Sequence, residues 1–499
     1  MLRFTRLLSL PLLVWVSTIL ASGQVNFTQF VFSNSPDGVF TNAIVAADFD
    51  KDGILDLMQT NDVGFVFYKG LGGGKFSTFG FEGNQINAGQ VVAADFNRDG
   101  NVDVAFIPSQ GQGGVTILTG NGDGFFLEDR LGSLITRSID VGGTAKSITL
   151  ADFNGDHLPD IAVSVCRTPT AGPCDTKVFL GRGDGTFRLS ATLRDGGGQI
   201  VAGDFNADGH QDLAVIAGNE VALYLGKGNG TFETPVLASL SHVASIAVGD
   251  FFHNRIQSLV ALVVAPVASN ESSTFLHALR FSEGHLLVEN QRLLQDHTGN
   301  PYLQVAAGDL NGDFKDDVFL IGGNGKDKPI SAYMLGNGNG TFEAPVAAPS
   351  VNVSESFSPS SVVIQKFPFV RDLSGNSRHD VGLVWILGSL ESGAEILLNT
   401  NATPNCSLPP ANALHVHICA PANGQVVGHT FTFRGSGNVL NGIAKRMELW
   451  IDGKKVAQNL EDQLKATVRL KRGPHVASFV VVDSFDSHVA RSVRFKSEF

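Results

Sequence analysis

Short apolar runs alternate with polar, glycine-rich turns along most of this chain. Runs of small or β-branched residues, such as 44–47, 91–94, 200–203 and 305–308, each precede an acidic cluster and a second apolar run. Short apolar runs bounded by glycine are typical of β-strands. The pattern returns after about fifty residues, which is typical of a repeat architecture. The hydrophobic pattern therefore predicts an all-β repeat protein.

A third apolar run in most repeats ends in a turn of the form Gly-x-Gly-x-Gly-x-Phe. Such turns occupy 120–126, 181–187, 226–232 and 336–342, with a related one at 70–76. Glycine and asparagine accept the positive φ of tight hairpins, so the Phe would begin a fourth strand. Four antiparallel strands per repeat make a propeller blade. The seven clusters begin at positions 48, 95, 152, 204, 250, 309 and 372, which predicts a seven-bladed β-propeller over residues 24–400.

The two ends of the repeat region are each incomplete. The last repeat stops after its third strand at 395–399, and an orphan strand at 25–32 precedes the first repeat. We expect the orphan strand to complete the last blade, because closure protects the edges that an open array exposes.

A different pattern follows a Pro- and Asn-rich linker at 401–413. Residues 414–499 contain six or seven short apolar segments, separated by turns such as Asp452-Gly453. This spacing predicts a small β-sandwich.

The N-terminus resembles a secretory signal. Arg3 and Arg6 precede an apolar run at 7–20 and small residues at 21–23, which predicts a signal peptide over 1–23. We expect a secreted monomer in an extracellular, cell-surface or periplasmic location, with no membrane insertion after signal removal. The formal net charge of −12 argues against nucleic acid as a partner.

Four cysteines suit an oxidising compartment, and they form two pairs that are local in sequence. We expect disulfides Cys166–Cys174 and Cys406–Cys419, with free buried thiols as the alternative.

The acidic clusters, called loops one to seven, place oxygen-bearing side chains at positions 1, 3, 5 and 9. Oxygen ligands in this number favour Ca²⁺ over zinc. The predicted ligands are Asp48, Asp50, Asp52 and Asp56; Asp95, Asn97, Asp99 and Asp103; Asp152, Asn154, Asp156 and Asp160; Asp204, Asn206, Asp208 and Asp212; Asp309, Asn311, Asp313 and Asp317; and Asp372, Ser374, Asn376 and Asp380.

The loops differ in how closely they follow this pattern. Loops three and six have His157 and Phe314 at position 6, where glycine would permit the sharp bend, and histidine accepts a left-handed backbone more readily than phenylalanine. Loop seven has two carboxylates, and loop five, from Asp250 to Ser258, has lost the alternation and is expected to keep its turn without a metal. The alternative is a set of solvated Asx turns, but five turns in the same register favour a counter-ion.

Taken together, these loops and Gly-rich turns resemble the FG-GAP/VCBS repeats of integrin α-chain-type β-propellers, over residues 25–400. The segment 418–424 resembles the start of bacterial Ig-like modules. The first resemblance implies that calcium loops lie on one face and that ligands are met on the opposite face. Candidate ligand loops are then 166–177, 265–274 and 322–329.

We expect a non-catalytic protein that binds an extracellular protein or a polysaccharide. The chain contains no Gly-x-Ser-x-Gly, His-Glu-x-x-His, P-loop or Rossmann motif. The tripeptide Arg182-Gly183-Asp184 belongs to a repeat turn, so we do not assign it to recognition. The alternatives are a polysaccharide-degrading enzyme on a calcium propeller and a scaffold without a specific ligand.

Overall fold

The computed structural model describes residues 25, 27–33, 41–52, 54–61, 64–72, 75–82, 88–108, 113–128, 134–168, 174–194, 196–266, 272–298, 301–311, 313, 315–322, 330–348, 366–371, 379–387, 391–399, 415–420, 426–427, 430–438, 444–459, 463–483 and 488–497. No helix occurs within these ranges, so the all-β prediction is confirmed. Their strands form seven four-stranded sheets, one three-stranded sheet and one five-stranded sheet.

We call the four-stranded sheets blades one to seven. Blades one to three contain β2 (Thr41–Ala47), β3 (Asp56–Asn61), β4 (Phe65–Gly72) and β5 (Lys75–Glu82); β6 (Ala88–Ala94), β7 (Asp103–Pro108), β8 (Val115–Leu118) and β9 (Thr136–Ile139); and β10 (Thr144–Ala151), β11 (Asp160–Cys166), β12 (Cys174–Gly181) and β13 (Phe187–Arg194). Blades four to six contain β14 (Ile200–Gly203), β15 (Asp212–Ala217), β16 (Glu220–Tyr224) and β17 (Val236–Ser239); β18 (Val243–Gly249), β19 (Ser258–Pro266), β20 (Ser272–Ser282) and β21 (His285–Thr298); and β22 (Tyr302–Gly308), β23 (Asp317–Gly322), β24 (Ile330–Met334) and β25 (Val346–Ala347).

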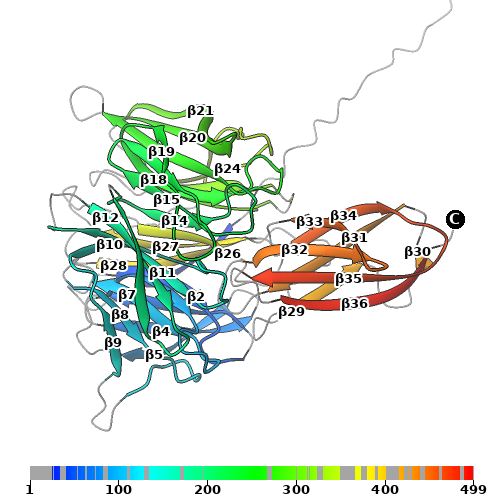
Figure 1. The fold of residues 1–499 in the computed structure, drawn as a ribbon, viewed down its shortest axis with the longest axis horizontal. Coiled ribbons are helices and arrows are strands. Elements are labelled where there is room, and N and C mark those ends of the chain that lie inside the picture. Colours follow the sequence, from blue (N-terminus) through cyan, green and yellow to red (C-terminus); the bar gives the residue numbers. More distant parts are fainter. Residues whose placement is uncertain are drawn as a thin grey trace, which may run out of the picture.

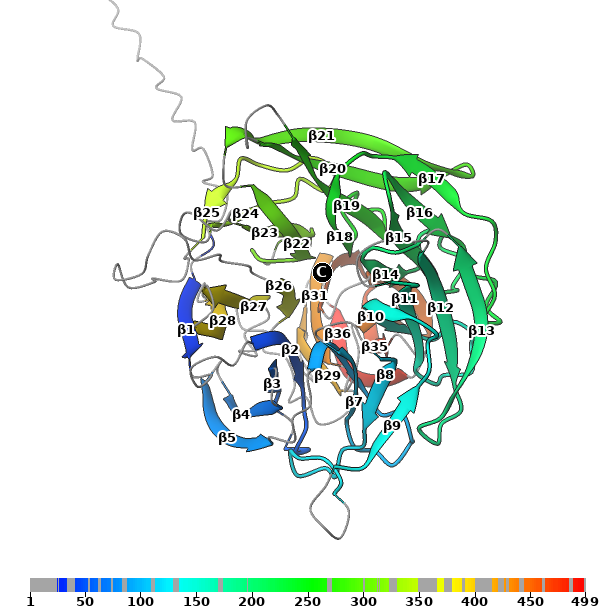
Figure 2. The same cartoon turned by 90° about the vertical axis from the view of Figure 1, so that its left-hand side faces the viewer.

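Blade seven combines strands from both ends of the repeat region. It contains β26 (Lys366–Arg371), β27 (Asp380–Leu387), β28 (Glu391–Asn399) and, beside β28, the N-terminal strand β1 (Phe27–Ser33). β1 runs antiparallel to β28, with Phe27 opposite Asn399 and Ser33 opposite Gly393. The sheets stand around a central axis, with β2, β6, β10, β14, β18, β22 and β26 innermost (Figure 2). We call this ring the propeller.

The hydrophobic core of the propeller is divided among the contacts between neighbouring blades. Phe65 of blade one packs with Phe106 of blade two, and Val163 of blade three packs in one cluster with Ile117 of blade two. Ile396 of blade seven packs with Leu57 of blade one. Among the described residues, the buried apolar clusters of the propeller each join two neighbouring blades, as expected for stacked repeats.

The C-terminal strands form a second body, which we call the sandwich. Its three-stranded sheet contains β29 (His415–Ala420), β31 (Thr430–Asn438) and β34 (Gln463–Arg469); its five-stranded sheet contains β30 (Val426–Val427), β36 (His488–Ser497), β35 (Gly473–Asp483), β32 (Ala444–Ile451) and β33 (Lys454–Asn459). Phe433 of the first sheet contacts Phe495 of the second with ring centroids 5.5 Å apart. The sandwich projects from one face of the propeller (Figure 1).

The part of the chain that the structure describes includes no helix long and apolar enough to cross a membrane. The predicted signal peptide at 1–23 and the linker at 401–413 lie outside the described residues.

Candidate metal centres

Loops two, three, four and five each join the first strand of a blade to the second through two residues with positive φ. At position 6, φ is 80° for Gly100, 88° for Gly209 and 64° for His157. His157 therefore adopts the left-handed backbone that glycine supplies elsewhere. Position 4 is also left-handed, with φ of 62° at Lys51 and 61° at Arg98. The sequence did not indicate this second requirement in loops one, two and four, because Lys51, Arg98 and Ala207 stand there, whereas loop three has Gly155 with φ of 74°.

The aspartate at position 1 holds this bend in place. The Asp95 carboxylate accepts the N–H groups of Asp99 at 3.2 Å and Gly100 at 2.9 Å. Loop four repeats the arrangement, since Asp204 accepts the N–H groups of Asp208 and Gly209 at 3.2 and 3.0 Å. Position 1 is thus part of the loop's own framework as well as a candidate ligand.

The aspartate at position 9 ties the loop to the Gly-rich turn of the same blade. One oxygen of Asp103 accepts the N–H of Phe96 at 2.9 Å, and the other accepts the N–H of Gly120 at 2.8 Å. The same pair of bonds is made by Asp56, Asp160, Asp212 and Asp317. Each oxygen retains a second acceptor site, so these bonds leave room for a cation.

Burial makes the ionised form of these carboxylates energetically unfavourable. The pKa of Asp56, Asp103, Asp160 and Asp212 is raised to about 7. Burial is the main cause and neighbouring loop carboxylates add to it, while the backbone hydrogen bonds oppose the rise. A bound cation would stabilise the charged form.

The donor set fits calcium. Candidate ligand oxygens of Asp48, Asp50 and Asp56 lie within 4.8 Å of one another in loop one. In loop two, the side-chain oxygen of Asn97 accepts the backbone N–H of Asp99 at 2.9 Å. The side-chain NH₂ of Asn97 donates to Oδ2 of Asp99 at 3.0 Å. All of these donors are hard oxygens, and clusters of such oxygens suit Ca²⁺.

Loop one also receives a side chain from β4. The Lys69 ammonium lies 2.8 Å from Oδ2 of Asp52 and makes a second, closer ion pair with Asp50. These two carboxylates raise the pKa of Lys69 above its ordinary value. No feature of the repeat pattern pointed to this contact.

Loops five, six and seven depart from loop two in different ways. In loop five, Asp250 still accepts the N–H groups of Asn254 and Arg255 at 3.0 and 2.8 Å, and the Ser258 hydroxyl accepts the N–H of Phe251 at 3.2 Å in place of a carboxylate. The turn therefore survives in loop five with fewer charged oxygens. Loop six places Lys315 3.1 Å from Asp313. In loop seven, Asp380 is buried, whereas Asp372, Ser374 and Asn376 lie outside the described residues.

The same loops also make hydrogen bonds and aromatic contacts to the neighbouring blade. The carbonyl of Phe153, at position 2 of loop three, accepts the N–H of Gly230 from the turn of blade four at 2.8 Å. The Phe153 ring meets Phe232, the last residue of that turn, edge to face at 5.7 Å. Equivalent contacts join Phe96 to Gly185 and Phe187, and Phe251 to Gly340 and Phe342. The Phe that follows the first Asp is therefore a contact between blades.

The first glycine of each Gly-rich turn allows the close approach to the loop. A Cβ added at Gly226 would lie 2.1 Å from the carbonyl oxygen of Gln211, and one at Gly120 would lie 2.1 Å from that of Val102. Only glycine fits at this point without moving the backbone.

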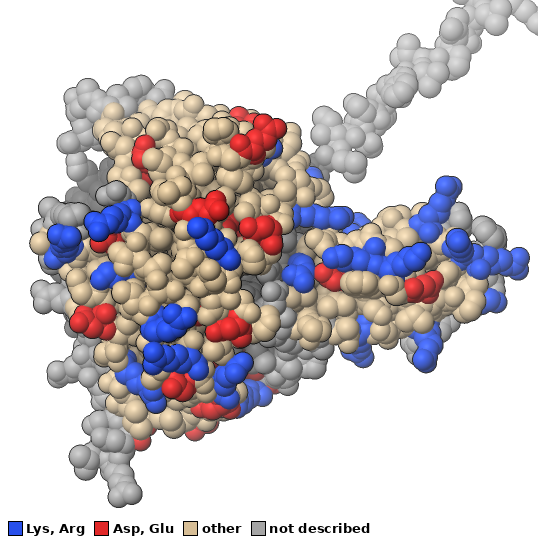
Figure 3. Space-filling model, in the orientation of Figure 1, with Lys and Arg blue, Asp and Glu red and all other residues tan. Residues whose placement is uncertain are grey.

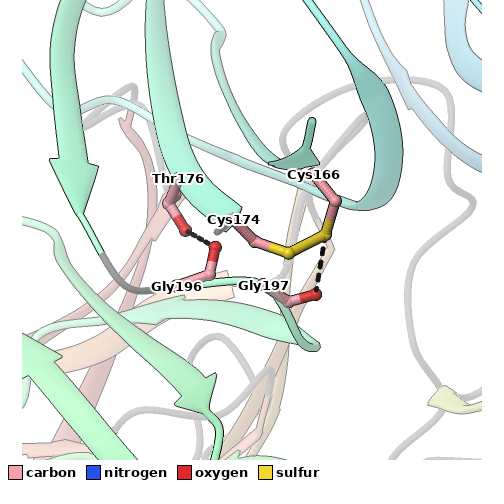
Figure 4. The surroundings of a disulfide bond; sticks show 5 residues. All are labelled: Cys166, Cys174, Thr176, Gly196 and Gly197. Carbon is pink, nitrogen blue, oxygen red and sulfur yellow. Dashed lines mark hydrogen bonds between the residues drawn. A yellow bond between two sulfur atoms is a disulfide. The ribbon is translucent and has the colours of Figure 1, made fainter. Parts of the chain in front are cut away.

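The disulfide lies at the opposite ends of the strands. Cys166 ends β11, Cys174 begins β12, and the predicted bond between them is present (Figure 4). It packs against the connection to blade four, where a Cβ at Gly197 would lie 2.3 Å from Cβ of Cys174. Thr176 also donates a hydrogen bond to the carbonyl of Gly196 at 3.4 Å. Cys406 lies outside the described residues, so Cys406–Cys419 stays a prediction.

The sandwich stands on the face that carries the acidic loops. A cavity of about 550 Å³ is lined by Gly209 of loop four and by the sandwich residues Arg446, Glu448, Trp450, Val480, Val482 and His488. Glu448 accepts hydrogen bonds from Arg446, Trp450 and Lys455 at 2.9, 2.8 and 3.1 Å. The visible face of the sandwich carries mainly Lys and Arg, whereas the propeller shows both signs of charge (Figure 3). The disulfide joins the ends of β11 and β12 that lie away from loop three, and the propeller face opposite the acidic loops is turned away from the sandwich (Figure 1).

Comparison with known protein families identifies three copies of one repeat. The family described as FG-GAP-like repeat matches residues 48–106, 95–163 and 204–260. These segments contain loops one, two, three, four and five, and the chain therefore contains FG-GAP-like repeats. A search of curated proteins found no match.

Several solved structures are similar to parts of the chain. An Agrocybe aegerita lectin that recognises non-reducing terminal N-acetylglucosamine is 16% identical, covering 66% of this chain and 81% of its own, with a TM-score of 0.42. A Bacillus licheniformis rhamnogalacturonan lyase is 12% identical, covering 76% of each chain, also with a TM-score of 0.42. Fibronectin(III)-like modules of Clostridium thermocellum CbhA are 20% identical over 17% of this chain and 97% of their own, with a TM-score of 0.16.

Proposed function

Because the chain contains FG-GAP-like repeats, we propose that it is a calcium-stabilised, non-catalytic binding protein that acts outside the cell. The observation that carries the calcium proposal is the repeated loop. Oxygen-bearing side chains stand at positions 1, 3, 5 and 9, those at positions 1, 3 and 9 of loop one lie within 4.8 Å of one another, and a buried carboxylate links loop to turn. The repeats and the disulfide also suggest an extracellular protein.

Calcium would be held by the side chains at positions 1, 3 and 5 of a loop, closed by the aspartate at position 9. Loops two, three and four offer this set in full: Asp95, Asn97, Asp99 and Asp103; Asp152, Asn154, Asp156 and Asp160; and Asp204, Asn206, Asp208 and Asp212. A cation there would offset the repulsion among loop carboxylates and stiffen the contact between blades that begins at position 2. We therefore assign calcium a structural role.

The proposed binding surface is the propeller face away from the sandwich. The second strands end and the third strands begin on that side, and in blade three these two strand ends are joined by Cys166–Cys174. Loops held by a rigid scaffold are where binding residues commonly lie. The acidic-loop face is the less accessible of the two, since the sandwich stands on it. We propose a protein or a surface polysaccharide as the partner.

A non-catalytic role is consistent with how the loop carboxylates are used. Those at positions 1 and 9 accept backbone N–H groups in loops two, three and four. Carboxylates committed in this way are suited to holding a cation and a turn, and less suited to moving protons to and from a substrate.

A glycan array and a pull-down from cell-surface protein fractions would test the binding proposal, each with calcium and with chelator. We expect saturable binding in calcium. The double substitution Cys166→Ser and Cys174→Ser should weaken binding, and a substitution on the sandwich, Lys465→Ala, should not. Cleavage of a polysaccharide on the array would favour the enzyme alternative, and no binding in either assay would favour a scaffold.

A further inference from the structure

The acidic loop of blade one has a cation of its own. The Lys69 side chain extends from β4 into loop one, where its ammonium lies 2.8 Å from Asp52 Oδ2 and pairs more closely still with Asp50. We propose that Lys69 is a built-in counter-ion, which takes the place of calcium in loop one and makes this loop the weakest calcium site among loops one to four. The inference rests on the proposed calcium binding of the other loops.

This lysine stands at a position that is uncharged in blades two, three, four and six, whereas strand register places Arg280 there in blade five, whose loop has lost the ligand pattern. The glycine whose N–H binds the position-9 carboxylate is Gly70 in blade one, and the residue before it is Lys69. Its counterparts, found by the same hydrogen bond in blades two, three, four and six, are Thr119, Leu180, Leu225 and Leu335. Among the five blades whose position-9 aspartate binds this glycine, a charged residue therefore stands here in blade one alone.

Loop one also differs from the other loops in having an additional carboxylate. Position 3 is an aspartate, Asp50, in loop one, whereas loops two, three, four and six have Asn97, Asn154, Asn206 and Asn311 there. The extra carboxylate and the extra ammonium thus occur in the same blade and contact each other. This combination of an aspartate at position 3 with a lysine before the glycine is found in loop one and not in loops two, three, four and six, which favours an internal substitute for an external ion.

The position of the ammonium explains the expected weakness of calcium binding. Positions 3 and 5 supply two of the four side-chain ligands of a loop, and in loop one both already pair with Lys69. A divalent ion would either displace this ammonium from Asp50 and Asp52 or lie close to a like charge, and both cost binding energy. The Lys315–Asp313 pair in loop six is different, because that lysine contacts one carboxylate and both side chains are more than one-third exposed.

Loop one lies in the blade next to the ring closure, so the replacement of calcium by Lys69 would affect the stability of that closure. Blade one adjoins blade seven, which contains the N-terminal strand, and Ile396 of blade seven packs with Ile44 and Leu57 of blade one. With Lys69 in place, part of the negative charge of loop one, in the blade next to the closure, stays offset when calcium is scarce. We infer that calcium removal loosens blades two to four before it loosens blade one.

Calcium titration by calorimetry tests the inference on the full chain. Lys69→Leu places in blade one the residue found in blades three, four and six, and Lys75→Leu is the matched control, since it removes an exposed lysine from β5 of the same blade. Lys69→Leu should bind one calcium ion more than the wild type, or bind one ion about tenfold more tightly. Lys75→Leu should behave as the wild type.

The outcomes separate this inference from the proposed function. If the wild type binds calcium and Lys69→Leu gives the same isotherm, the inference on Lys69 is wrong and the calcium function stands. If the wild type binds no calcium, both are wrong. Crystals of the wild type grown with terbium give a test that needs no variant. We expect anomalous scattering peaks in loops two, three and four, and a strong peak in loop one with Lys69 displaced would overturn the inference.

Discussion

At the scale of single residues, the carboxylate at position 9 is the group that joins loop to turn and would close the proposed calcium site. Both oxygens of Asp103 accept backbone N–H groups, and the side chain is almost fully buried. An asparagine there could accept from only one of the two donors and would turn its own amide toward the other. A buried donor left without a partner costs about 1–3 kcal/mol.

We therefore expect Asp103→Asn to lower the free energy of unfolding by about 1–3 kcal/mol in calcium, measured by urea denaturation of the propeller. Asp123→Asn is the matched control. Asp123 is an exposed turn residue that accepts the N–H of Phe125 at 3.2 Å, a bond that asparagine can also accept. The control should stay within about 0.5 kcal/mol of the wild type. Equal losses in the two variants would contradict the role assigned to Asp103.

The pKa of His475, in the sandwich, should be shifted by the groups that contact its ring. Nδ1 of His475 lies 2.7 Å from the Asp452 carboxylate, and Nε2 lies 2.6 Å from the carbonyl of Lys471. Burial lowers the pKa of His475, but these two acceptors favour the imidazolium and raise the pKa overall above 6.5. For Asp452, burial raises the pKa, and hydrogen bonds from His475 and Val476 lower it overall below 3.8.

The pair should therefore stabilise the sandwich over a limited pH range. The contribution of His475 is complete below pH 6.5 and is lost as the pH rises through its raised pKa in the folded state. That of Asp452 is complete above pH 3.8 and is lost as the pH falls through its lowered pKa. An NMR titration of the His475 ring should give a pKa above 6.5, and Asp452→Asn should lower it. An unchanged pKa in that variant would show that the contact is absent in solution.

At the scale of elements, the Phe–Phe contacts between blades should act as coupled pairs. Phe153 and Phe232 come from blades three and four, and their rings meet edge to face at 5.7 Å. Such pairs contribute about 0.5–1.5 kcal/mol beyond the area they bury. A double-mutant cycle of Phe153→Leu and Phe232→Leu should give a coupling energy of that size. The cycle of Phe153→Leu with Phe433→Leu in the sandwich should be additive, and equal coupling in the two cycles would contradict the contact.

The sequence predicted the elements whose pattern repeats and missed those set by a single contact. The strands before and after each acidic cluster follow from the apolar runs, and β1 follows from the missing fourth strand of the last repeat. Lys69 could not be found this way, because its contact with Asp50 depends on the register between β3 and β4. The left-handed backbone at Lys51 and Arg98 was also missed, since neither residue signals positive φ.

In blade five, the repeat pattern also fails to predict an entire hairpin. It has no Gly-rich turn of the repeat form, yet β20 and β21 form its longest hairpin, with Ser282 opposite His285 and a turn at Glu283-Gly284. Repeat matching fails there because different residues, Glu283 at φ 52° and Gly284 at φ 80°, make the bend.

At the scale of the whole molecule, closure of the ring depends on β1. Seven residue pairs join β1 to β28, from Phe27–Asn399 to Ser33–Gly393. A chain that starts at residue 34 would leave the edge of β28 unpaired, and unpaired edges associate. We expect this truncation to lower the melting temperature and to cause self-association in size-exclusion chromatography. A chain starting at residue 25 is the control, and identical behaviour of the two would mean that the ring closes without β1.

The central claim is that several acidic loops bind calcium and that this binding holds the blades together. Extracellular calcium modules bind with dissociation constants of about 10⁻⁴ to 10⁻³ M. At about 10 mM calcium, each such site would stabilise the folded state by roughly 1.4–2.7 kcal/mol, so several sites should shift unfolding clearly.

Differential scanning calorimetry of the full chain, in about 10 mM calcium and in excess chelator, tests the claim most directly. We predict that calcium raises the melting temperature of the propeller by several degrees and leaves the transition of the sandwich in place, because the candidate ligands lie in the propeller alone. Superimposable transitions in calcium and in chelator would contradict the account.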